Sequence, residues 1–192
     1  MKVLDENYVK ENIDFIVDEI RAGKIFIYPT DTLYGLGCDA TNSNSVRKIK
    51  EIKRRSKGAS FLVMVPNLDW ISKNTKFHES NLDLINSKLP GPYSFIVKLK
   101  NMNVVSSEIL EGKETLGVRF PKCIFSNVVE RLQSPFVSTS VNFSKEEPAT
   151  SIESIDKEIL NQVDYIIKSN FTMLKRPSEI IDIITKDAKN LR

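Results

Sequence analysis

The sequence predicts an α/β protein in which a mixed β-sheet carries helices on its faces. Short apolar segments typical of buried strands are interspersed with amphipathic segments typical of helices, and strict strand–helix–strand alternation is absent. Three polar segments, at residues 30–37, 53–59 and 138–144, each follow a predicted strand. Because such strand ends often form binding sites in α/β proteins, we expect these segments to share one site.

The composition places the chain among globular proteins. Its 192 residues suffice for one sizeable core, so we expect a single domain over residues 1–192. No run of about 18 apolar residues is present and the N-terminus lacks a signal-peptide centre, which predicts no membrane partner and a cytoplasmic location. The net charge of +3 is too small to indicate nucleic-acid binding by itself but is compatible with anionic ligands.

Hydrophobic periodicity and capping residues locate the remaining elements. Strands are predicted at residues 25–28, 61–65, 93–99, 115–119, 136–140, 163–167 and 179–185. Helices are predicted at 7–22, from 42–45 to about 54, around 67–71, at 79–88 with Leu82, Leu84 and Ile85 inward, after Pro121, and from Ser151 to about Ile159. Residues 101–113 form a loop or a short helix.

The stretch at residues 24–39, KIFIYPTDTLYGLGCD, is the most informative part of the chain. Pro29 ends the first strand because proline has no N–H to donate. Hydroxyl groups follow at Thr30, Thr32 and Tyr34, and the next two glycines, at 35 and 37, allow a sharp turn or a close approach to a ligand. An ordinary strand-to-helix connection would give the same pattern.

The chain is poor in the usual catalytic nucleophiles and bases. Cys38 and Cys123 are the only cysteines, and small buried filler is their more common role. The single histidine, His78, is expected at the surface, and no Cys and His spacing resembles a zinc site, so no metal ligands are assigned. Arg119 ends a predicted strand, and a site rich in cations and hydroxyls suits a ligand with phosphates and a carboxylate. Neither of the common nucleotide-binding motifs, GxxxxGK[ST] and GxGxxG, is present, so a nucleotide would have to be held in another way.

Five motifs occur in a specific order: IYPTDTLYGLGCDA, KRR at 53–55, LPGP at 89–92, TLGVRFP at 115–121 and STSVNFS at 138–144. Together they resemble the YrdC family of threonylcarbamoyl-AMP synthases, in its short form without an extra C-terminal domain. The resemblance implies a twisted mixed sheet with flanking helices around a basic cavity. It also implies the reaction of an L-threonylcarbamoyladenylate synthase, a nucleotidyltransferase that makes threonylcarbamoyl-AMP and pyrophosphate from L-threonine, bicarbonate or CO2, and ATP with Mg2+.

The resemblance also implies roles for ten residues. Four match threonine-binding positions: Thr32, Arg119 (the carboxylate partner), Ser138 and Ser178. Six match ATP-binding positions: Lys53, Arg55, Thr115, Ser140, Asn142 and Arg192. Of these six, Lys53, Arg55, Ser140 and Asn142 form the catalytic lysine-x-arginine and serine-x-asparagine pairs, the latter near ATP and its metal.

The sequence departs from the family pattern at several positions. Residues 56–60 read SKGAS, with Ala59 in place of a usual nucleotide contact, and Lys57 is a candidate replacement for a lost phosphate contact. Met64 replaces a residue that is often histidine, Lys145 a usual glycine, and Pro148 a common serine. These departures bear on affinity and activity.

Two alternative functions stay open. The segment RKIKEIKRRSK at 47–57 has seven bases and one acid, which would suit a module that binds tRNA or double-stranded RNA. A catalytically degenerate paralogue is the other alternative. In the leading hypothesis, a transferase partner moves the threonylcarbamoyl group onto adenosine 37 of tRNA.

Overall fold

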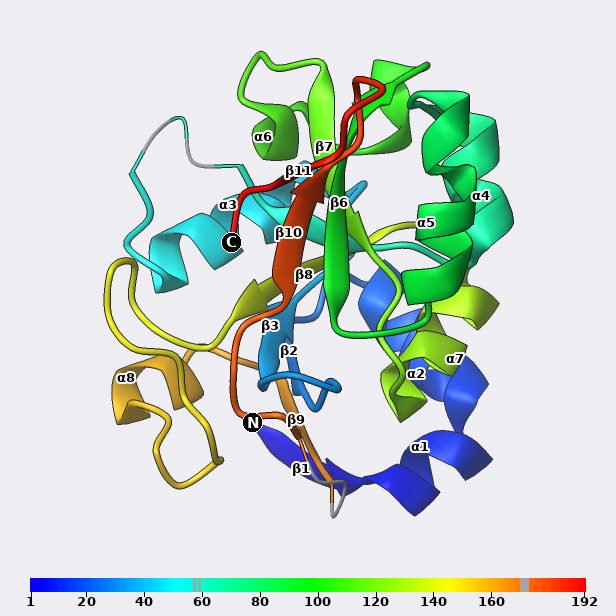
Figure 1. Ribbon diagram of the computed structural model, residues 1–192. Helices are drawn as coiled ribbons and strands as arrows, with labels where there is room; N and C mark the ends of the chain where they lie inside the picture. Colours follow the sequence, from blue (N-terminus) through cyan, green and yellow to red (C-terminus); the bar gives the residue numbers. More distant parts are fainter. Residues whose placement is uncertain (57, 59, 170–172) are drawn as a thin grey trace.

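A computed structural model describes residues 1–56, 58, 60–169 and 173–192. The described residues form an eleven-stranded twisted sheet with helices against it (Figure 1). Its strand order is β1-β9-β2-β3-β8-β4-β7-β6-β10-β11, and β5 pairs with β6. Parallel and antiparallel pairs are mixed, which confirms the predicted α/β class.

The strands are β1 (Lys2–Asp5), β2 (Phe26–Tyr28), β3 (Gly35–Gly37), β4 (Leu62–Met64), β5 (Thr75–Lys76), β6 (Tyr93–Leu99), β7 (Thr115–Arg119), β8 (Phe136–Ser140), β9 (Tyr165–Lys168), β10 (Glu179–Asp182) and β11 (Lys189–Asn190). The helices are α1 (Glu6–Glu11), α2 (Ile13–Arg21), α3 (Ser43–Ile52), α4 (Leu68–Asn74), α5 (Leu82–Lys88), α6 (Ser107–Leu110), α7 (Ile124–Leu132) and α8 (Lys157–Leu160), with 3-10 turns η1 (Glu79–Asn81) and η2 (Met102–Val104).

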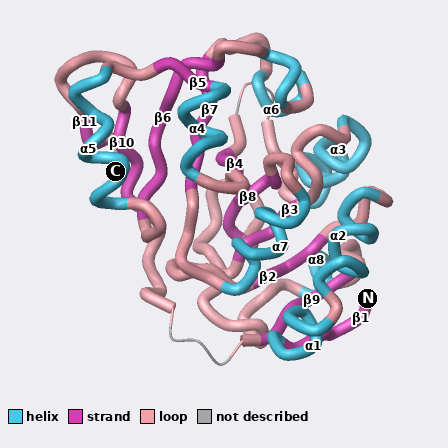
Figure 2. The backbone as a smooth tube through the Cα atoms, turned by 90° about the vertical axis from the view of Figure 1, so that its right-hand side faces the viewer, coloured by secondary structure: helices cyan, strands magenta, loops and turns pink. Residues whose placement is uncertain are grey.

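The sheet separates two hydrophobic clusters. Successive side chains of a strand point to opposite faces, and in β2 the side chains of Phe26 and Tyr28 enter one cluster while Ile27 enters the other. The first of these clusters is completed by apolar residues of α1, α2 and α7, and Figure 2 shows α2 and α7 close together beside the sheet. The larger cluster contains the buried faces of α3 and α6.

Three strands were predicted with the bounds that the structure shows: β6, β7 and β8. The second helix was also predicted correctly, because Asn42 caps α3 by accepting hydrogen bonds from the N–H groups of Asn44 and Ser45. None of the helices in the described ranges combines the length and the apolar content that a membrane crossing needs.

The prediction of one helix at residues 7–22 was wrong. Asn12 interrupts it with non-helical backbone angles, and its Nδ2 donates to the carbonyl of Tyr8 at 2.9 Å, so α1 and α2 are separate. The residues before α1 form the unpredicted edge strand β1, which pairs in parallel with β9. A four-residue edge strand has too short a pattern to be recognised from periodicity.

Residues 35–37 form β3, where the sequence predicted a loop. Neither glycine turns the chain; both allow close packing. A Cβ atom on Gly35 would lie 2.6 Å from the Tyr28 ring, and one on Gly37 would lie 2.0 Å from the carbonyl oxygen of Val137. The predicted sharp turn is therefore wrong, whereas Gly35 does line the cavity described below, so a close approach to a ligand stays a prediction.

Four smaller predictions were also wrong. Leu82 is 44% exposed and does not face the core. The helix predicted from Ser151 is reduced to α8, because Ser151 and Ser154 hold a turn through reciprocal bonds between their hydroxyls and N–H groups. The helix expected to open at Pro121 starts at Ile124, and the last long strand ends at Asp182.

Candidate active site

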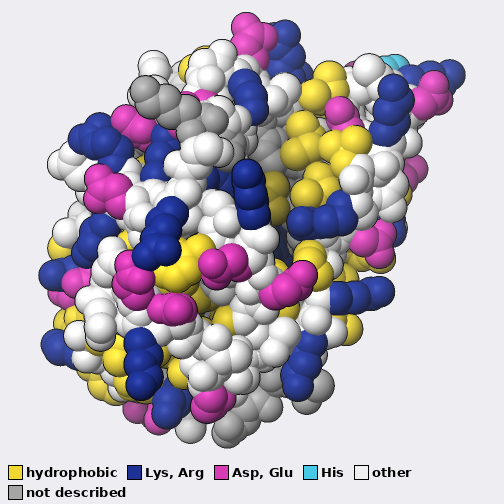
Figure 3. All heavy atoms as spheres, turned by 90° about the vertical axis from the view of Figure 1, so that its left-hand side faces the viewer, with side chains coloured by type: hydrophobic (Ala, Val, Ile, Leu, Met, Phe, Trp, Pro, Cys, Tyr) yellow, Lys and Arg dark blue, Asp and Glu magenta, His cyan; other side chains and the backbone are white. Residues whose placement is uncertain are grey.

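A cavity of about 370 Å3 lies where the polar segments meet. Figure 3 shows one face of the molecule, which is hollowed near its centre and carries Lys and Arg side chains beside the opening. The charged residues that line the cavity within the described ranges are three arginines, Arg55, Arg119 and Arg192, and no carboxylate lines it there. The lining hydroxyl residues are Thr32, Tyr34, Ser60, Ser138, Thr139, Ser140 and Ser178. This lining suits an anionic, hydrogen-bonding ligand.

The loop between β2 and β3 forms one corner of the cavity. Thr30 is 1% exposed, and its Oγ1 donates to the carbonyl of Leu33 at 2.7 Å while accepting from the N–H groups of Thr32 and Leu33 at 3.2 Å. The hydroxyls of Thr30 and Thr32 lie 2.9 Å apart. The loop is therefore held rigid by its own hydroxyl groups, with Thr32 facing the cavity.

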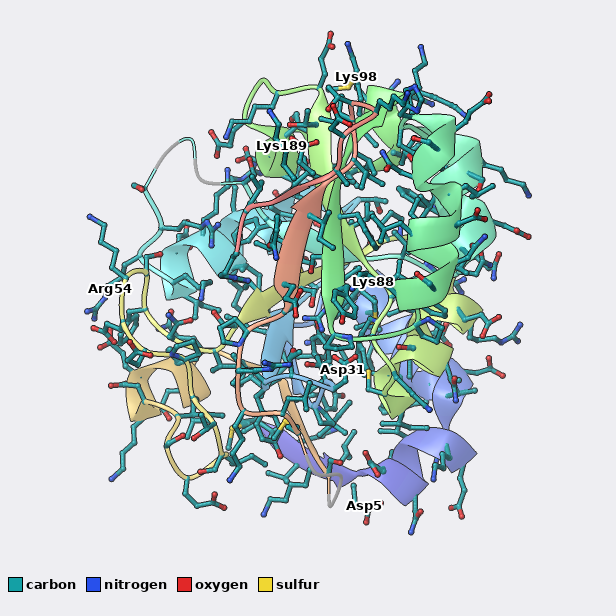
Figure 4. All side chains as sticks on the ribbon, viewed as in Figure 1. Asp5, Asp31, Arg54, Lys88, Lys98 and Lys189 are labelled. Carbon is teal, nitrogen blue, oxygen red and sulfur yellow. The ribbon has the colours of Figure 1, made fainter. Side chains whose placement is uncertain are left out.

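Arg119, at the end of β7, is held in the same corner. Its Nη2 donates to Asp31 Oδ1 at 3.0 Å and to Thr32 Oγ1 at 3.2 Å. The other carboxylate oxygen of Asp31 accepts from the N–H of Lys122 at 3.0 Å, and Figure 4 shows Asp31 in the loop at the foot of the sheet. The Nε of Arg119 is buried and has no hydrogen-bond partner among the described residues. Described residues use only the Nη2 donors, so the fixed guanidinium of this cavity-lining residue keeps further N–H donors for a ligand.

The opposite corner is formed by the turn that follows β8. Lys53 is only 2% exposed, and its Nζ donates to the carbonyls of Ser140 and Asn142 at 2.6 and 2.8 Å and to Asn142 Oδ1 at 3.0 Å. Ser140 Oγ also donates to Asn142 Oδ1, at 2.6 Å, and Asn142 Nδ2 donates to the carbonyls of Phe143 and Glu146. Lys53 thus holds this turn in place through hydrogen bonds, although it does not itself line the cavity.

The environment of Lys53 lowers the pKa of its ammonium to about 7. Removal from water is the main cause, and the positive charge of Arg55 adds to it. Three oxygens surround Nζ, which matches the number of protons on an ammonium group. Lys53 therefore titrates near neutral pH at a position that controls the turn at residues 140–142.

Arg55 extends into the cavity from the segment after α3. Its guanidinium lies over the ring of Phe61, 4.4 Å from the ring centroid, and Nη2 donates to the carbonyl of Ser60. Burial lowers the pKa of Arg55 from its ordinary value. Stacking on an aromatic ring restricts the guanidinium to one orientation, so a cation is presented to the cavity with little freedom to lose on binding.

The C-terminal part of the chain closes another side of the cavity. The N–H groups of Leu174 and Lys175 donate to the carbonyls of Asp31 and Thr32, at 3.0 and 2.9 Å. Further along, Ser178 Oγ lies 2.9 Å from the hydroxyl of Ser94, and the carbonyl of Ser178 accepts from Nε and Nη2 of Arg192 at 3.2 and 3.1 Å. Burial and the nearby charge of Arg119 lower the pKa of Arg192.

Seven of the ten residues assigned from the sequence line the cavity: Thr32, Arg55, Arg119, Ser138, Ser140, Ser178 and Arg192. Asn142 lies beside the cavity in the turn after β8, and Lys53, which follows α3, donates hydrogen bonds to that turn. Thr115 lies at the start of β7, two residues before the lining residue Gly117. Pro148 also lines the cavity, whereas Met64 is buried in the smaller hydrophobic cluster. Lys57 and Ala59 lie outside the described residues.

Sequence reasoning missed two residues that shape the site. Asp31 lies in the predicted loop, but no role was predicted for it from the sequence. The signal available in the sequence was a single acidic residue within a segment otherwise suited to anionic ligands. Phe61, read as part of a buried strand, supports Arg55. Such a contact depends on tertiary structure and leaves no local pattern in the sequence.

The basic segment at 47–57 is largely neutralised where it is described. Arg47 and Lys50 pair with Glu108, Lys50 also with Glu111, and Arg54 with Glu158. In Figure 4, Arg54 extends from the edge of the molecule, away from Asp31. This face therefore offers less free positive charge than its sequence indicates.

The residues with possible nucleophilic or metal-binding chemistry lie elsewhere. Cys38 is buried and Cys123 half-buried, both thiols are free, and burial raises the pKa of each. His78 is exposed and accepts from the N–H of Ser80 at 3.3 Å, as expected for a helix cap. Within the described ranges, no group of three or more His, Cys, Asp or Glu side chains is arranged to hold a metal ion.

These features define a mixed α/β protein with an arginine- and hydroxyl-lined cavity. The family model Sua5_yciO_yrdC, described as "Telomere recombination", matches residues 18–192. The chain therefore belongs to the Sua5/YciO/YrdC family.

Two curated relatives cover most of the chain. A Methanocaldococcus jannaschii protein named putative threonylcarbamoyl-AMP synthase is 34% identical over 94% of this chain and 84% of its own length. The Escherichia coli K12 protein YciO is 30% identical over 93% of this chain and 86% of its own length.

Solved structures agree on the fold. A structure of H234A/Y235A P. abyssi Sua5 matches all of this chain with a TM-score of 0.87 and 26% identity, and this chain spans 59% of its length. The crystal structure of E. coli YciO matches with a TM-score of 0.84 and 25% identity, over 100% of this chain and 94% of YciO.

Proposed function

We propose that the protein is an L-threonylcarbamoyladenylate synthase. The observation that carries the proposal is the convergence of seven assigned residues on one cavity lined by three arginines and by hydroxyls. Those seven residues come from segments as far apart in the chain as Thr32 and Arg192. The name of the M. jannaschii relative supports the same reaction.

The proposed chemistry needs no nucleophile from the protein. The amine of L-threonine attacks CO2 and loses a proton, which gives a carbamate. A carbamate oxygen then attacks the α-phosphorus of ATP, and the bond to the bridging oxygen breaks as pyrophosphate leaves. The absence of a histidine or carboxylate from the described lining is consistent with this route. The protein contributes alignment and charge stabilisation.

The site divides into two functional parts. Arg119 and Thr32 form the amino-acid part, in which the guanidinium of Arg119 offers donors to the carboxylate. Arg55 and the turn held by Lys53 form the phosphate part, where the guanidinium stabilises charge that develops on the leaving pyrophosphate. This division follows the assignment made from the sequence, with Lys53 acting through the turn.

The donor set fits magnesium that arrives with ATP. No carboxylate lines the cavity in the described ranges, and Mg2+ in nucleotide sites is commonly held by phosphates with few protein ligands. The proton of Ser140 Oγ is donated to Asn142, which leaves that oxygen able to act as a ligand. The ion would neutralise charge on the phosphates.

Pyrophosphate release tests the proposal. The protein is incubated with Mg-ATP, bicarbonate and pyrophosphatase, with L-threonine, D-threonine or no amino acid. We expect phosphate release that depends on L-threonine and bicarbonate. Release that is equal without an amino acid, or absent from a folded sample, would contradict the proposal. Transfer to tRNA by a partner is a separate step and requires that partner in the assay.

A further inference from the structure

The loop at residues 30–33 fixes the direction of the Thr32 hydroxyl. Thr30 Oγ1 donates to the carbonyl of Leu33 at 2.7 Å. A hydroxyl has one proton, so Thr30 cannot also donate to Thr32. The contact between the two hydroxyls is 2.9 Å, shorter than the 3.2 Å contacts that Thr30 Oγ1 also accepts from the N–H groups of Thr32 and Leu33, so we assign the proton between the hydroxyls to Thr32.

Thr32 is left as an acceptor toward the cavity. Its one proton is directed to Thr30, and its oxygen already accepts from Nη2 of Arg119 at 3.2 Å. A ligand group that approaches this oxygen must bring a proton, because two acceptors that face each other repel. Carboxylate and phosphate oxygens are excluded from this contact, and an N–H or O–H group is favoured.

The neighbouring group has the opposite preference. Arg119 lines the cavity, and its guanidinium carries only donors, of which the described residues use those of Nη2. An acceptor and a donor thus lie side by side at the cavity wall. In an α-amino acid the amino and carboxylate groups are attached to the same carbon, so they also lie side by side. The amino group can donate to Thr32, and the carboxylate can accept from Arg119.

We propose that Thr30 is a positioning residue that makes Thr32 an obligate acceptor, so that an α-amino acid binds with its amino N–H toward Thr32 and its carboxylate toward Arg119. This rests on the amino-acid part of the proposed function. Thr30 itself does not line the cavity. When an amine adds CO2 and releases one proton, the carbamate nitrogen keeps one N–H, so the contact with Thr32 persists through the step.

The first test compares Thr30→Val with Thr30→Ser. Valine preserves the shape but removes the hydroxyl, whereas serine keeps it. We expect Thr30→Val to weaken L-threonine binding about three- to tenfold, with ATP binding changed less than about twofold, and Thr30→Ser to retain wild-type affinity. Calorimetry measures both ligands.

Thr75→Val is the matched control. Thr75 is 2% exposed and its hydroxyl donates to the carbonyl of Ile71 at 2.7 Å, like Thr30, but it lies on β5, away from the cavity. We expect unchanged affinity for both ligands. A loss equal to that of Thr30→Val would show a general effect of removing a buried hydroxyl and would overturn the inference.

The second test separates hydrogen-bond polarity from simple packing. On the carbon next to the carboxylate, L-2-aminobutyrate carries an amino group, which donates, and 2-oxobutanoate carries a keto oxygen, which accepts. Each compound is titrated as a competitor of L-threonine. The wild type should prefer the amine. In Thr30→Val the proton of Thr32 is released and can be donated to the keto oxygen, so the preference should fall at least about threefold. A merely structural effect would weaken both competitors equally.

The inference can fail separately from the proposed function. Wild-type protein that binds no L-threonine would remove the proposed function. Wild-type binding with an unchanged amine preference in Thr30→Val would overturn only the role of Thr30. If Thr30→Val does not fold, Thr32→Val is titrated with the same competitors, and an unchanged preference there would overturn the inference as well.

Discussion

Two buried cations beside the same cavity are held in opposite ways. Arg119 is 7% exposed, lines the cavity, pairs through Nη2 with the carboxylate of Asp31, and keeps guanidinium donors that no described residue uses. Lys53 is 2% exposed, does not line the cavity, and donates all three ammonium protons to neutral oxygens of Ser140 and Asn142. One cation has a donor left for a ligand, and the other has none.

The difference indicates that Arg119 is suited to binding a ligand and Lys53 to supporting the structure of the site. The charge of Arg119 is compensated by the buried carboxylate of Asp31. The partners of Lys53 are dipoles, and burial lowers its pKa to about 7. Under the proposed function, Arg119 would contact the amino acid directly, and Lys53 would control the turn that contributes Ser140 to the cavity.

Removal of the Arg119 side chain should have the largest effect. Arg119→Ala leaves the buried Asp31 carboxylate without its cationic partner, which should cost about 3–5 kcal/mol of unfolding free energy. L-threonine affinity should fall about 10- to 100-fold, because a charge-assisted hydrogen bond is lost. ATP affinity should change much less. Denaturant unfolding and calorimetry measure these effects.

Arg119→Lys serves as the companion variant. It retains the charge beside Asp31 but lacks the planar fork, so stability should be largely restored and threonine affinity only partly. Equal losses of threonine and ATP affinity in this folded variant would contradict the assignment of Arg119 to the carboxylate.

Lys53→Met should have an intermediate effect with a distinctive pH dependence. The folded-state pKa of about 7 is below that of an unfolded lysine, so above pH 7 the unfolded state binds more protons. Wild-type stability should therefore rise with pH relative to Lys53→Met, by at most about 1.4 kcal/mol per pH unit between pH 7 and 9. Urea unfolding at each pH gives the difference.

Lys50→Met is the matched control for this comparison. Lys50 lies in the last turn of α3, the helix that ends just before Lys53, and forms ion pairs with Glu108 and Glu111, which raise its pKa. Its removal should not produce the rise between pH 7 and 9. A Lys53→Met protein whose stability stays parallel to the wild type over this range would argue against a titrating buried lysine.

The smallest effect is expected at a cation of the basic segment outside the cavity. Arg54 pairs with Glu158 at the surface and lies over Phe143, 4.1 Å from its ring centroid. Arg54→Ala should lower the unfolding free energy by less than about 1 kcal/mol and leave threonine and ATP affinity unchanged. Thermal unfolding and the same titrations measure this.

Arg54→Ala also bears on RNA binding. Phosphate-driven binding of tRNA should fall steeply with salt, and the loss of a phosphate contact should reduce that salt dependence. Tight tRNA binding by the wild type that weakens in Arg54→Ala would favour the RNA-binding alternative over the assignment of the basic segment to ion pairs.

The sequence predicted the fold class and most of the cavity. Strands β6, β7 and β8 have strong apolar patterns with clear boundaries, and the ordered motifs identified seven of the lining residues. Such features are local and can be recognised along the chain. The short strands β1, β5 and β11 were missed, because two to four residues carry no usable period.

The orientation of individual side chains could not be predicted. Lys53 belongs to the same motif as Arg55, yet only Arg55 lines the cavity. The difference arises from the turn at residues 140–146, which folds over Lys53 from almost ninety positions away in the chain. Asp31 likewise acquires its role only when β7 brings Arg119 beside it.

Thermal unfolding with ligands tests most directly whether one cavity binds both substrates. L-threonine, Mg-ATP, and the two together with bicarbonate are compared with D-threonine as control. A ligand that binds the folded state raises Tm, so we predict a rise with L-threonine and with Mg-ATP, and a larger rise with both. No shift with either ligand, or an equal shift with D-threonine, would contradict the account.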